Sequence, residues 1–146
     1  MKKIFCLLVL VTLLLGSVGC TIRSNGSDGF EFSFSTANMT DAVMTTDIQD
    51  CKPVDTVTTY PQDAPHFIAV GILNNAPEDT KVKFVWNYIT VEQVIDEVVV
   101  DAEGKSDVYI SSTLSSDNLW PTGDYSVDIY IEGRDDPDAT VLFSVE

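Results

Sequence analysis

The sequence predicts an all-β domain, an antiparallel β-sandwich of about seven strands. Short segments rich in β-branched and aromatic residues recur along the chain, with turns containing Gly, Pro, Asn or Asp between them. Residues 80–89 and 124–131 alternate apolar and polar side chains, which is typical of strands with one buried face. No segment has a convincing long helical pattern, so the strands must bury their apolar faces against one another.

A signal peptide is expected at residues 1–19, ahead of the sandwich. Lys2 and Lys3 give a basic start, residues 4–15 are mostly apolar, and small residues follow. The apolar stretch is shorter than the ~20 residues that a membrane-spanning helix needs. The segment "SVGC" resembles the lipobox of bacterial lipoproteins, which implies cleavage before Cys20 and attachment of lipid, such as palmitate-type acyl chains, to its thiol. Ordinary signal-peptidase cleavage, with Cys20 left unmodified, is the alternative.

This interpretation divides the chain into three parts. Residues 1–19 are removed, residues 20–38 form a lipidated cysteine and a flexible tether rich in Ser, Gly, Asn and Thr, and residues 39–146 form the sandwich. The expected location is the cell membrane or the outer membrane, with the domain facing away from the cytoplasm. Acylation leaves Cys51 as an odd thiol; without it, a Cys20–Cys51 disulfide is the alternative.

The charge of the chain is strongly acidic. Loss of Lys2 and Lys3 with the signal peptide leaves 6 basic residues against 23 acidic ones. Nucleic-acid binding needs clustered Lys and Arg, so the sequence argues against a nucleic-acid partner. A soluble, non-adhesive exterior explains this composition more simply than a cation-binding surface.

The individual strands follow from the apolar pattern and the turn residues. The expected strands are 42–48, a weaker 54–60, 66–73, 80–89, about 94–101, 107–114, 124–131 and 140–145. Residues 91–100 are ambiguous, since Val91, Val94, Ile95, Val98 and Val99 also fit a helical stripe. The β-branched composition favours a strand there. A hairpin turn through Glu103-Gly104 is expected to pair it with 107–114.

The segment "LWPTGDYSVDIY" at residues 119–130 resembles immunoglobulin-like and fibronectin type III-like domains. The resemblance implies that the Tyr125 hydroxyl hydrogen-bonds the backbone of the preceding loop, and that Trp86 is a core residue of an earlier strand. It implies an immunoglobulin-like sandwich and says almost nothing about function. Trp120, in the loop before Pro121, is either a partly exposed binding residue or a plug at one end of the sandwich.

Few residues suit catalysis or metal binding. His66 is the single histidine, no nucleophile elbow is present, and Cys/His spacings for zinc are missing. The sequence therefore predicts that the chain is not an enzyme and needs no cofactor. Asp135, Asp136 and Asp138 form the one calcium candidate, although a solvated acidic turn explains them more simply.

A binding face is expected on the outer side of strands 80–89 and 124–131, if these strands are neighbours. Val85, Asn87, Ile89 and Tyr130 would then point outward near one another, with Lys81 and Lys83 opposite acidic residues. The leading hypothesis is a lipid-anchored envelope module that binds a protein or a glycan. The alternatives are a small envelope hydrolase and a calcium-dependent adhesion module.

Overall fold

Residues 36–105 and 107–146, the parts of the chain that the computed structural model describes, form a nearly all-β domain. The predicted signal peptide, Cys20 and the predicted tether up to residue 35 lie outside the described residues. The elements are β1 (Asn38–Thr45), β2 (Ile48–Gln49), β3 (Lys52–Pro53), β4 (Thr59–Tyr60), β5 (His66–Asn74), β6 (Lys81–Tyr88), the 3-10 turn η1 (Ile89–Val91), β7 (Gln93–Asp101), β8 (Val108–Ser115), β9 (Gly123–Ile131) and β10 (Ala139–Val145).

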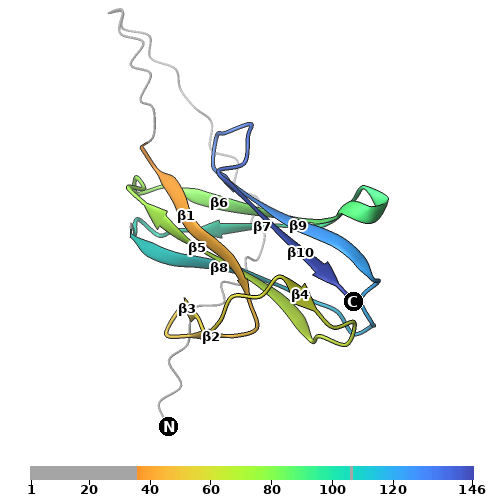
Figure 1. The fold of residues 1–146 in the computed structure, drawn as a ribbon. Coiled ribbons are helices and arrows are strands. Elements are labelled where there is room, and N and C mark those ends of the chain that lie inside the picture. The colour runs from red at the N-terminus through yellow and green to blue at the C-terminus, as the bar shows by residue number, and fades with distance from the viewer. Residues whose placement is uncertain (1–35, 106) are drawn as a thin grey trace, which may run out of the picture. The chain divides into compact units, whose positions relative to one another are not determined.

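Two sheets make up the body of the domain (Figure 1). One has three strands in the order β1-β5-β8, and the other has five in the order β4-β10-β9-β6-β7. Strand neighbours are antiparallel, apart from the parallel pair β4 and β10. Buried side chains of both sheets belong to one apolar core, as the predicted β-sandwich requires.

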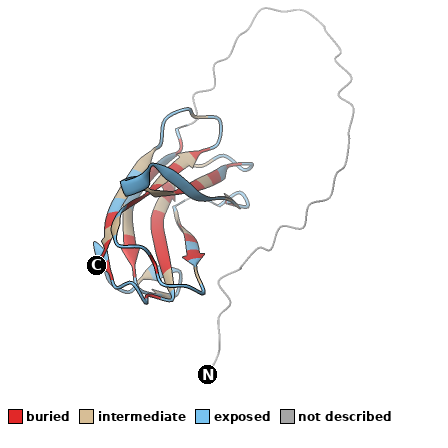
Figure 2. Ribbon diagram, turned by 90° about the vertical axis from the view of Figure 1, so that its right-hand side faces the viewer, coloured by how far each residue is buried: buried red, intermediate tan, exposed pale blue. Residues whose placement is uncertain are grey.

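The alternation predicted from the sequence sets which face of each strand is buried. In β6, Val82, Phe84 and Trp86 are fully buried, and in β9 the same is true of Val127 and Ile129. Figure 2 shows buried positions along the central strands, whereas the turns are largely exposed. The sheets meet through side chains of period two, as expected for antiparallel strands with one face in the core.

Aromatic rings fill much of this core. The Trp86 ring contacts Phe143 edge-on, and its indole Nε1–H donates to Ser112 Oγ of the opposite sheet at 3.2 Å. Tyr125 stacks on Phe143 with a centroid distance of 5.3 Å. The Tyr125 hydroxyl donates to the carbonyl oxygen of Pro121 at 2.7 Å, which fixes the loop that leads into β9.

At Gly71 of β5, the neighbouring strand β1 approaches closely. A Cβ atom at this position would lie 2.5 Å from the Met39 sulfur of β1. The neighbouring strand β1 carries a bulge between Thr40 and Val43, where Asp41 has a φ of 50°. Glycine at position 71 therefore leaves room for the Met39 side chain, and the bulge lies on the partner strand.

The predicted pairing of 94–101 with 107–114 is wrong. β7 pairs with β6, and β8 pairs with β5 in the other sheet. The reason lies in the connection: Ala102 is buried, and its N–H donates to the carbonyl oxygen of Thr80 at 3.0 Å. This bond ties the end of β7 to the start of β6, and the following turn carries the chain to the opposite sheet.

The predicted strands 42–48 and 54–60 are also corrected. β1 begins at Asn38 and ends at Thr45, and only Thr59–Tyr60 of the second segment forms a strand. The carboxylate of Asp55 accepts hydrogen bonds from the hydroxyls of Thr45 and Thr46, both at 2.6 Å. These side-chain bonds hold the segment in place where a strand ladder was expected.

Cys51 lies at the exposed tip of the small hairpin formed by β2 and β3. Asp50 and Cys51 have φ values of 51° and 64°, as a two-residue hairpin turn of type I′ requires. Cys51 is disulfide-bonded, and the other two cysteines of the sequence, Cys6 and Cys20, are not among the described residues. In the described portion of the chain, no helix is long and apolar enough to cross a membrane.

Candidate functional site

The outer face of the five-stranded sheet brings together most of the residues predicted to bind a partner. β6 and β9 are neighbours, with Lys83 opposite Tyr130, Val85 opposite Asp128 and Asn87 opposite Ser126. β10 extends this face on the far side of β9, and β7 extends it on the far side of β6. The face therefore combines side chains from two pairs of consecutive strands, β6 with β7 and β9 with β10.

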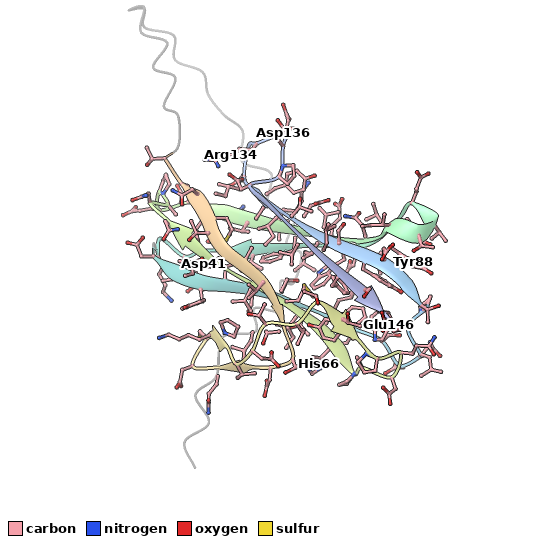
Figure 3. The ribbon with its side chains drawn as sticks, in the orientation of Figure 1. Asp41, His66, Tyr88, Arg134, Asp136 and Glu146 are labelled. Atoms are coloured by element: carbon pink, nitrogen blue, oxygen red, sulfur yellow. The ribbon has the colours of Figure 1, made fainter. Side chains whose placement is uncertain are left out.

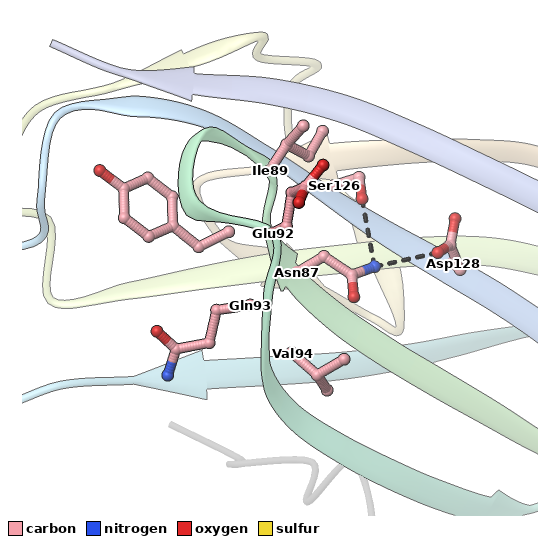
Figure 4. Close-up of a pocket in the computed structure, with 8 residues that line it drawn as sticks. Asn87, Ile89, Glu92, Gln93, Val94, Ser126 and Asp128 are labelled. Carbon is pink, nitrogen blue, oxygen red and sulfur yellow. Dashed lines mark hydrogen bonds between the residues drawn. The ribbon is translucent and has the colours of Figure 1, made fainter.

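A hydrogen-bonded polar network occupies the centre of this face (Figure 4). The Asn87 amide Nδ2 donates to Ser126 Oγ at 3.2 Å and to Asp128 Oδ2 at 2.9 Å. The other carboxylate oxygen of Asp128 accepts from the Thr140 hydroxyl at 2.7 Å. The network holds these four side chains in fixed orientations across β6, β9 and β10, so the surface is organised before any ligand arrives.

Exposed aliphatic side chains surround the network. Their exposed fractions are 41% for Ile89, 54% for Val94 and 64% for Leu142. We call the combination of the network and these three side chains the outer-face patch; its members are Asn87, Ser126, Asp128, Thr140, Ile89, Val94 and Leu142. An apolar surface with a few fixed polar groups is the usual composition of a site that recognises another molecule.

Two shallow hollows give the patch its shape. The first, of about 270 Å³, is lined by Asn87, Ile89 and Val94 among others, and the second, of about 430 Å³, by Ile89 and Leu142 among others. Ile89 forms the wall that both hollows share. It lies in η1, where the chain turns from β6 into β7 and Glu92 adopts a left-handed conformation with a φ of 53°.

Lys83 and Tyr130 form the neighbouring part of the outer face. The Lys83 ammonium lies 4.8 Å from the centre of the Tyr130 ring, within the range of a cation–π contact. The cross-strand ion pairs expected for Lys81 and Lys83 are not formed in the described structure; its ion pairs are Lys105–Glu103 and Arg134–Asp138.

Two residues predicted to bind a partner, Val85 and Trp120, are buried. Val85 does belong to the outer face but is only 7% exposed, because it lies in the middle of the sheet with Glu97 and Asp128 opposite it. Trp120 is 6% exposed and belongs to the core. Its ring contacts Phe67 with a centroid distance of 4.1 Å, and its Nε1–H donates to the carbonyl oxygen of Ala64 at 2.7 Å.

The predicted calcium ligands Asp135, Asp136 and Asp138 do not come together in a binding site. Asp138 accepts hydrogen bonds from the Ile131 N–H at 2.9 Å and from the Arg134 guanidinium, so its carboxylate points back into the turn. Asp135 and Asp136 remain exposed, and Figure 3 shows Arg134 and Asp136 at the turn that joins β9 to β10. Within residues 36–105 and 107–146, no group of three Cys, His, Asp or Glu side chains lies close enough to hold a metal ion.

Three ionisable groups with shifted pKa values lie outside the outer-face patch. Hydrogen bonds from Thr45 and Thr46 lower the pKa of the exposed Asp55 carboxyl. Burial raises the pKa of Tyr60 to about 12 and, with a smaller contribution from Tyr88, raises that of Tyr125 to about 12. All three groups hold the fold together through hydrogen bonds.

Sequence reasoning missed Leu142, Val94 and the polar partners of Asn87. Leu142 carried a usable indication, because it is the apolar residue out of phase with Val141 and Phe143, which face the core side of β10. Val94 carried none, because a register shift between β6 and β7 at this point changes which side chains face outward.

No family model and no curated protein matches the chain. Among solved structures, the chain is similar to an alkylpurine DNA glycosylase from Pseudomonas fluorescens, solved bound to DNA containing an abasic site analog. The identity is 11%, the TM-score is 0.46, and the match covers 75% of this chain and 30% of that one.

This neighbour corrects two exclusions drawn from the sequence. The chain was expected not to be an enzyme and not to bind nucleic acid, whereas the matched protein is a glycosylase bound to DNA. Neither exclusion is retained. A TM-score of 0.46 at 11% identity also assigns neither glycosylase activity nor DNA binding to this chain.

Proposed function

We propose that this chain is an exported, lipid-anchored envelope protein whose immunoglobulin-like domain binds a protein partner through the outer-face patch. The observation that carries the proposal is the patch itself, in which exposed Ile89, Val94 and Leu142 surround the fixed network of Asn87 and Asp128. Exposed aliphatic groups beside oriented donors and acceptors favour a partner that supplies both apolar and polar groups.

An immunoglobulin-like topology is supported by three features. The sheet orders β1-β5-β8 and β4-β10-β9-β6-β7 match those of such domains when a strand is added beside the third strand of the fold. Trp86 lies on that third strand, β6, in the core. Tyr125 makes the corner hydrogen bond at the start of β9. Val127 occupies the position two residues later, where antibody domains carry a cysteine.

A protein partner fits the patch better than a glycan. Sugar-binding surfaces use exposed aromatic rings as stacking platforms. Both tryptophans, Trp86 and Trp120, are buried, and the face of the Tyr130 ring is engaged by Lys83. The exposed apolar side chains of the patch are Ile, Val and Leu, which are suited to packing against the side chains of another protein.

Site-specific photo-cross-linking in the native envelope tests the binding surface. A photoreactive amino acid in place of Leu142 should yield a cross-linked protein species, whereas the same replacement of Leu119 should not. Leu119 is the matched control, because it is 67% exposed against 64% for Leu142 and lies in the loop between β8 and β9. The species should disappear when Val94→Lys is added. Equal cross-linking at both positions, or none at position 142, contradicts the proposal.

The anchor is tested by the intact mass of the protein extracted from its membrane without reductant. Lipid attached to a chain that begins at Cys20 supports the proposal. The competing outcome is a Cys20–Cys51 disulfide. Cys51 is disulfide-bonded, and Cys20 is the only other cysteine left once residues 1–19 are removed. One sulfur cannot be acylated and disulfide-bonded together. A mass lower by two hydrogens, without lipid, therefore contradicts the anchor and leaves an exported soluble domain.

A further inference from the structure

The outer edge of β7 has no strand partner among the described residues. β7 is the last strand of the five-stranded sheet, and β6 is its one partner among the described residues. After the register shift, residues 96–101 pair regularly with residues 81–86 of β6. Every second residue of such a strand directs its N–H and C=O groups away from the sheet, so this stretch presents free backbone donors and acceptors.

The other strand edges of the domain are less suited to pairing. β4, at the opposite edge of the same sheet, is two residues long. β1 is interrupted by its bulge at Asp41. β8 presents mainly Ser and Thr at its exposed positions. Within β7, residues 96–101 contain neither Pro nor Lys, the residues that commonly prevent edge pairing, and Val99 is 53% exposed.

The acidic residues of β7 indicate which kind of partner segment could pair with its edge. Residues 96–101 have the sequence DEVVVD, in which three valines are flanked by Asp96, Glu97 and Asp101. The chain contains no basic residue between Lys83 and Lys105. A segment that places Lys or Arg opposite these acids and β-branched residues opposite the valines gains both the backbone ladder and favourable cross-strand pairs.

We propose that the β7 edge, residues 96–101, binds an extended segment of a partner protein that carries basic residues around a short β-branched run, by adding it as a sixth strand of the sheet. A second copy of this chain fits worse. Antiparallel pairing of residues 96–101 with themselves in full register would place Asp96 opposite Asp101, and the chain has a net charge of −15. The inference concerns the edge of the sheet and does not depend on the outer-face patch.

The test uses the hexapeptide KVVVKK, blocked at both ends, which places a lysine opposite each acid when it pairs antiparallel with residues 96–101. It is added to the mature protein while hydrogen exchange of backbone amides is followed. The amides on the free edge of residues 96–101 should exchange about tenfold more slowly, and those of β4 should not change. The peptide EVVVEE and a KVVVKK peptide methylated on alternate backbone nitrogens are the controls, and neither should protect.

Charge-reversal variants supply the second measurement. Asp96→Lys combined with Glu97→Lys should weaken binding of KVVVKK about tenfold or more, because two cross-strand charge pairs become repulsive. The matched control is Asp135→Lys with Asp136→Lys, which makes the same charge change at exposed positions of the β9–β10 turn and should bind normally. Circular dichroism verifies that both variants fold.

Each remaining outcome overturns the inference. Equal binding of the methylated peptide would mean charge attraction without strand pairing. No protection of residues 96–101 by KVVVKK would mean that this edge does not accept a strand. Protection that depends on protein concentration alone, with a dimer in sedimentation, would replace the partner segment by a second copy of the chain.

Discussion

Replacing Tyr125 by Phe tests whether the Tyr125 hydroxyl stabilises the fold through its hydrogen bond, and whether its burial makes that stability depend on pH. The variant loses the bond from the Tyr125 hydroxyl to Pro121, which is 2.7 Å long. A buried hydrogen bond of this kind contributes about 0.5–1.5 kcal/mol net, so Tyr125→Phe should lower the free energy of unfolding by about 1 kcal/mol at pH 8.

The effect should vanish and then reverse at alkaline pH. Burial, followed by the charge of Tyr88, raises the pKa of Tyr125 from 10.0 to about 12 in the folded protein. The unfolded chain therefore loses the proton first. The stabilisation by the neutral hydroxyl is complete below pH 10 and is lost as the pH rises toward 12. At pH 11 the loss from Tyr125 alone is about 1 kcal/mol, after allowance for solvent screening of its partly buried hydroxyl, and the Phe variant does not undergo it.

Urea unfolding of both proteins at intervals between pH 8 and pH 11.5 measures this difference. The wild type should be more stable at pH 8, equal near pH 11 and less stable above it. Tyr60→Phe is an independent repeat, because the Tyr60 hydroxyl donates to the Thr45 carbonyl oxygen at 2.6 Å and its pKa is also about 12. A constant difference between wild type and Tyr125→Phe across this pH range would refute the reasoning.

Three further predictions concern single residues. Gly123→Ala should lower the free energy of unfolding by about 1–3 kcal/mol in urea titration, since φ is 144° and a Cβ would lie 2.4 Å from Thr90 Oγ1; an unchanged midpoint would contradict this. Ser112→Ala should cost about 1–3 kcal/mol, because it leaves the buried indole N–H of Trp86 without its acceptor, whereas Ser111→Ala on the opposite face should stay within about 0.5 kcal/mol. Asp55→Asn should remove the contribution of Asp55 to the acid dependence of stability: its pKa is lowered in the folded state, so this contribution is present at neutral pH and is lost as the pH falls through that pKa. A thermal-melting profile of Asp55→Asn identical to the wild type between pH 2 and pH 7 would count against this role.

The sequence predicted the parts of the fold that depend on local pattern. Alternation gave the buried faces of β6 and β9, and the apolar run at residues 66–73 gave a strand that is buried on both sides, with Ile68 and Val70 covered as well as Phe67. These predictions succeed because the period of two is set by strand geometry and does not depend on which strands are neighbours.

Where distant contacts decide, the sequence left a choice open or predicted wrongly. Trp120 had two interpretations, a partly exposed binding residue or a plug at one end of the sandwich. Its burial favours the plug, and its N–H donates to Gln62 and its indole to Ala64, more than fifty positions earlier. The turn after β7 resembled a hairpin, yet the Ala102 N–H is bound to Thr80. Neither partner can be identified from the residues around Trp120 or Ala102. The Trp120 contacts join segments that are distant in the sequence, and the Ala102 contact depends on which strand pairs with β7.

The candidate site was predicted to the extent that neighbouring strands were guessed correctly. Asn87, Ile89 and Tyr130 followed from placing β6 beside β9. The alternation in β10 indicates that Leu142 faces outward, but placing it beside the network required the position of β10 in the sheet. Val94 required the register shift between β6 and β7. The sequence encodes neither of these locally. The role of Thr140 in the network could not be predicted either, because its hydrogen bond to Asp128 joins β10 to β9.

The two sheets treat their outward apolar residues differently, and this contrast is the strongest argument that the outer-face patch serves recognition. Ile68 and Val70 of the three-stranded sheet lie outside the main core cluster, yet they are only 5% and 1% exposed. On the five-stranded sheet, Leu142 and Val94 are 64% and 54% exposed. The five-stranded sheet covers Val85 in its middle but leaves Leu142 and Val94 open. Ordinary folding gains nothing from that exposure, whereas a partner that covers Leu142 and Val94 would recover the burial that the chain forgoes.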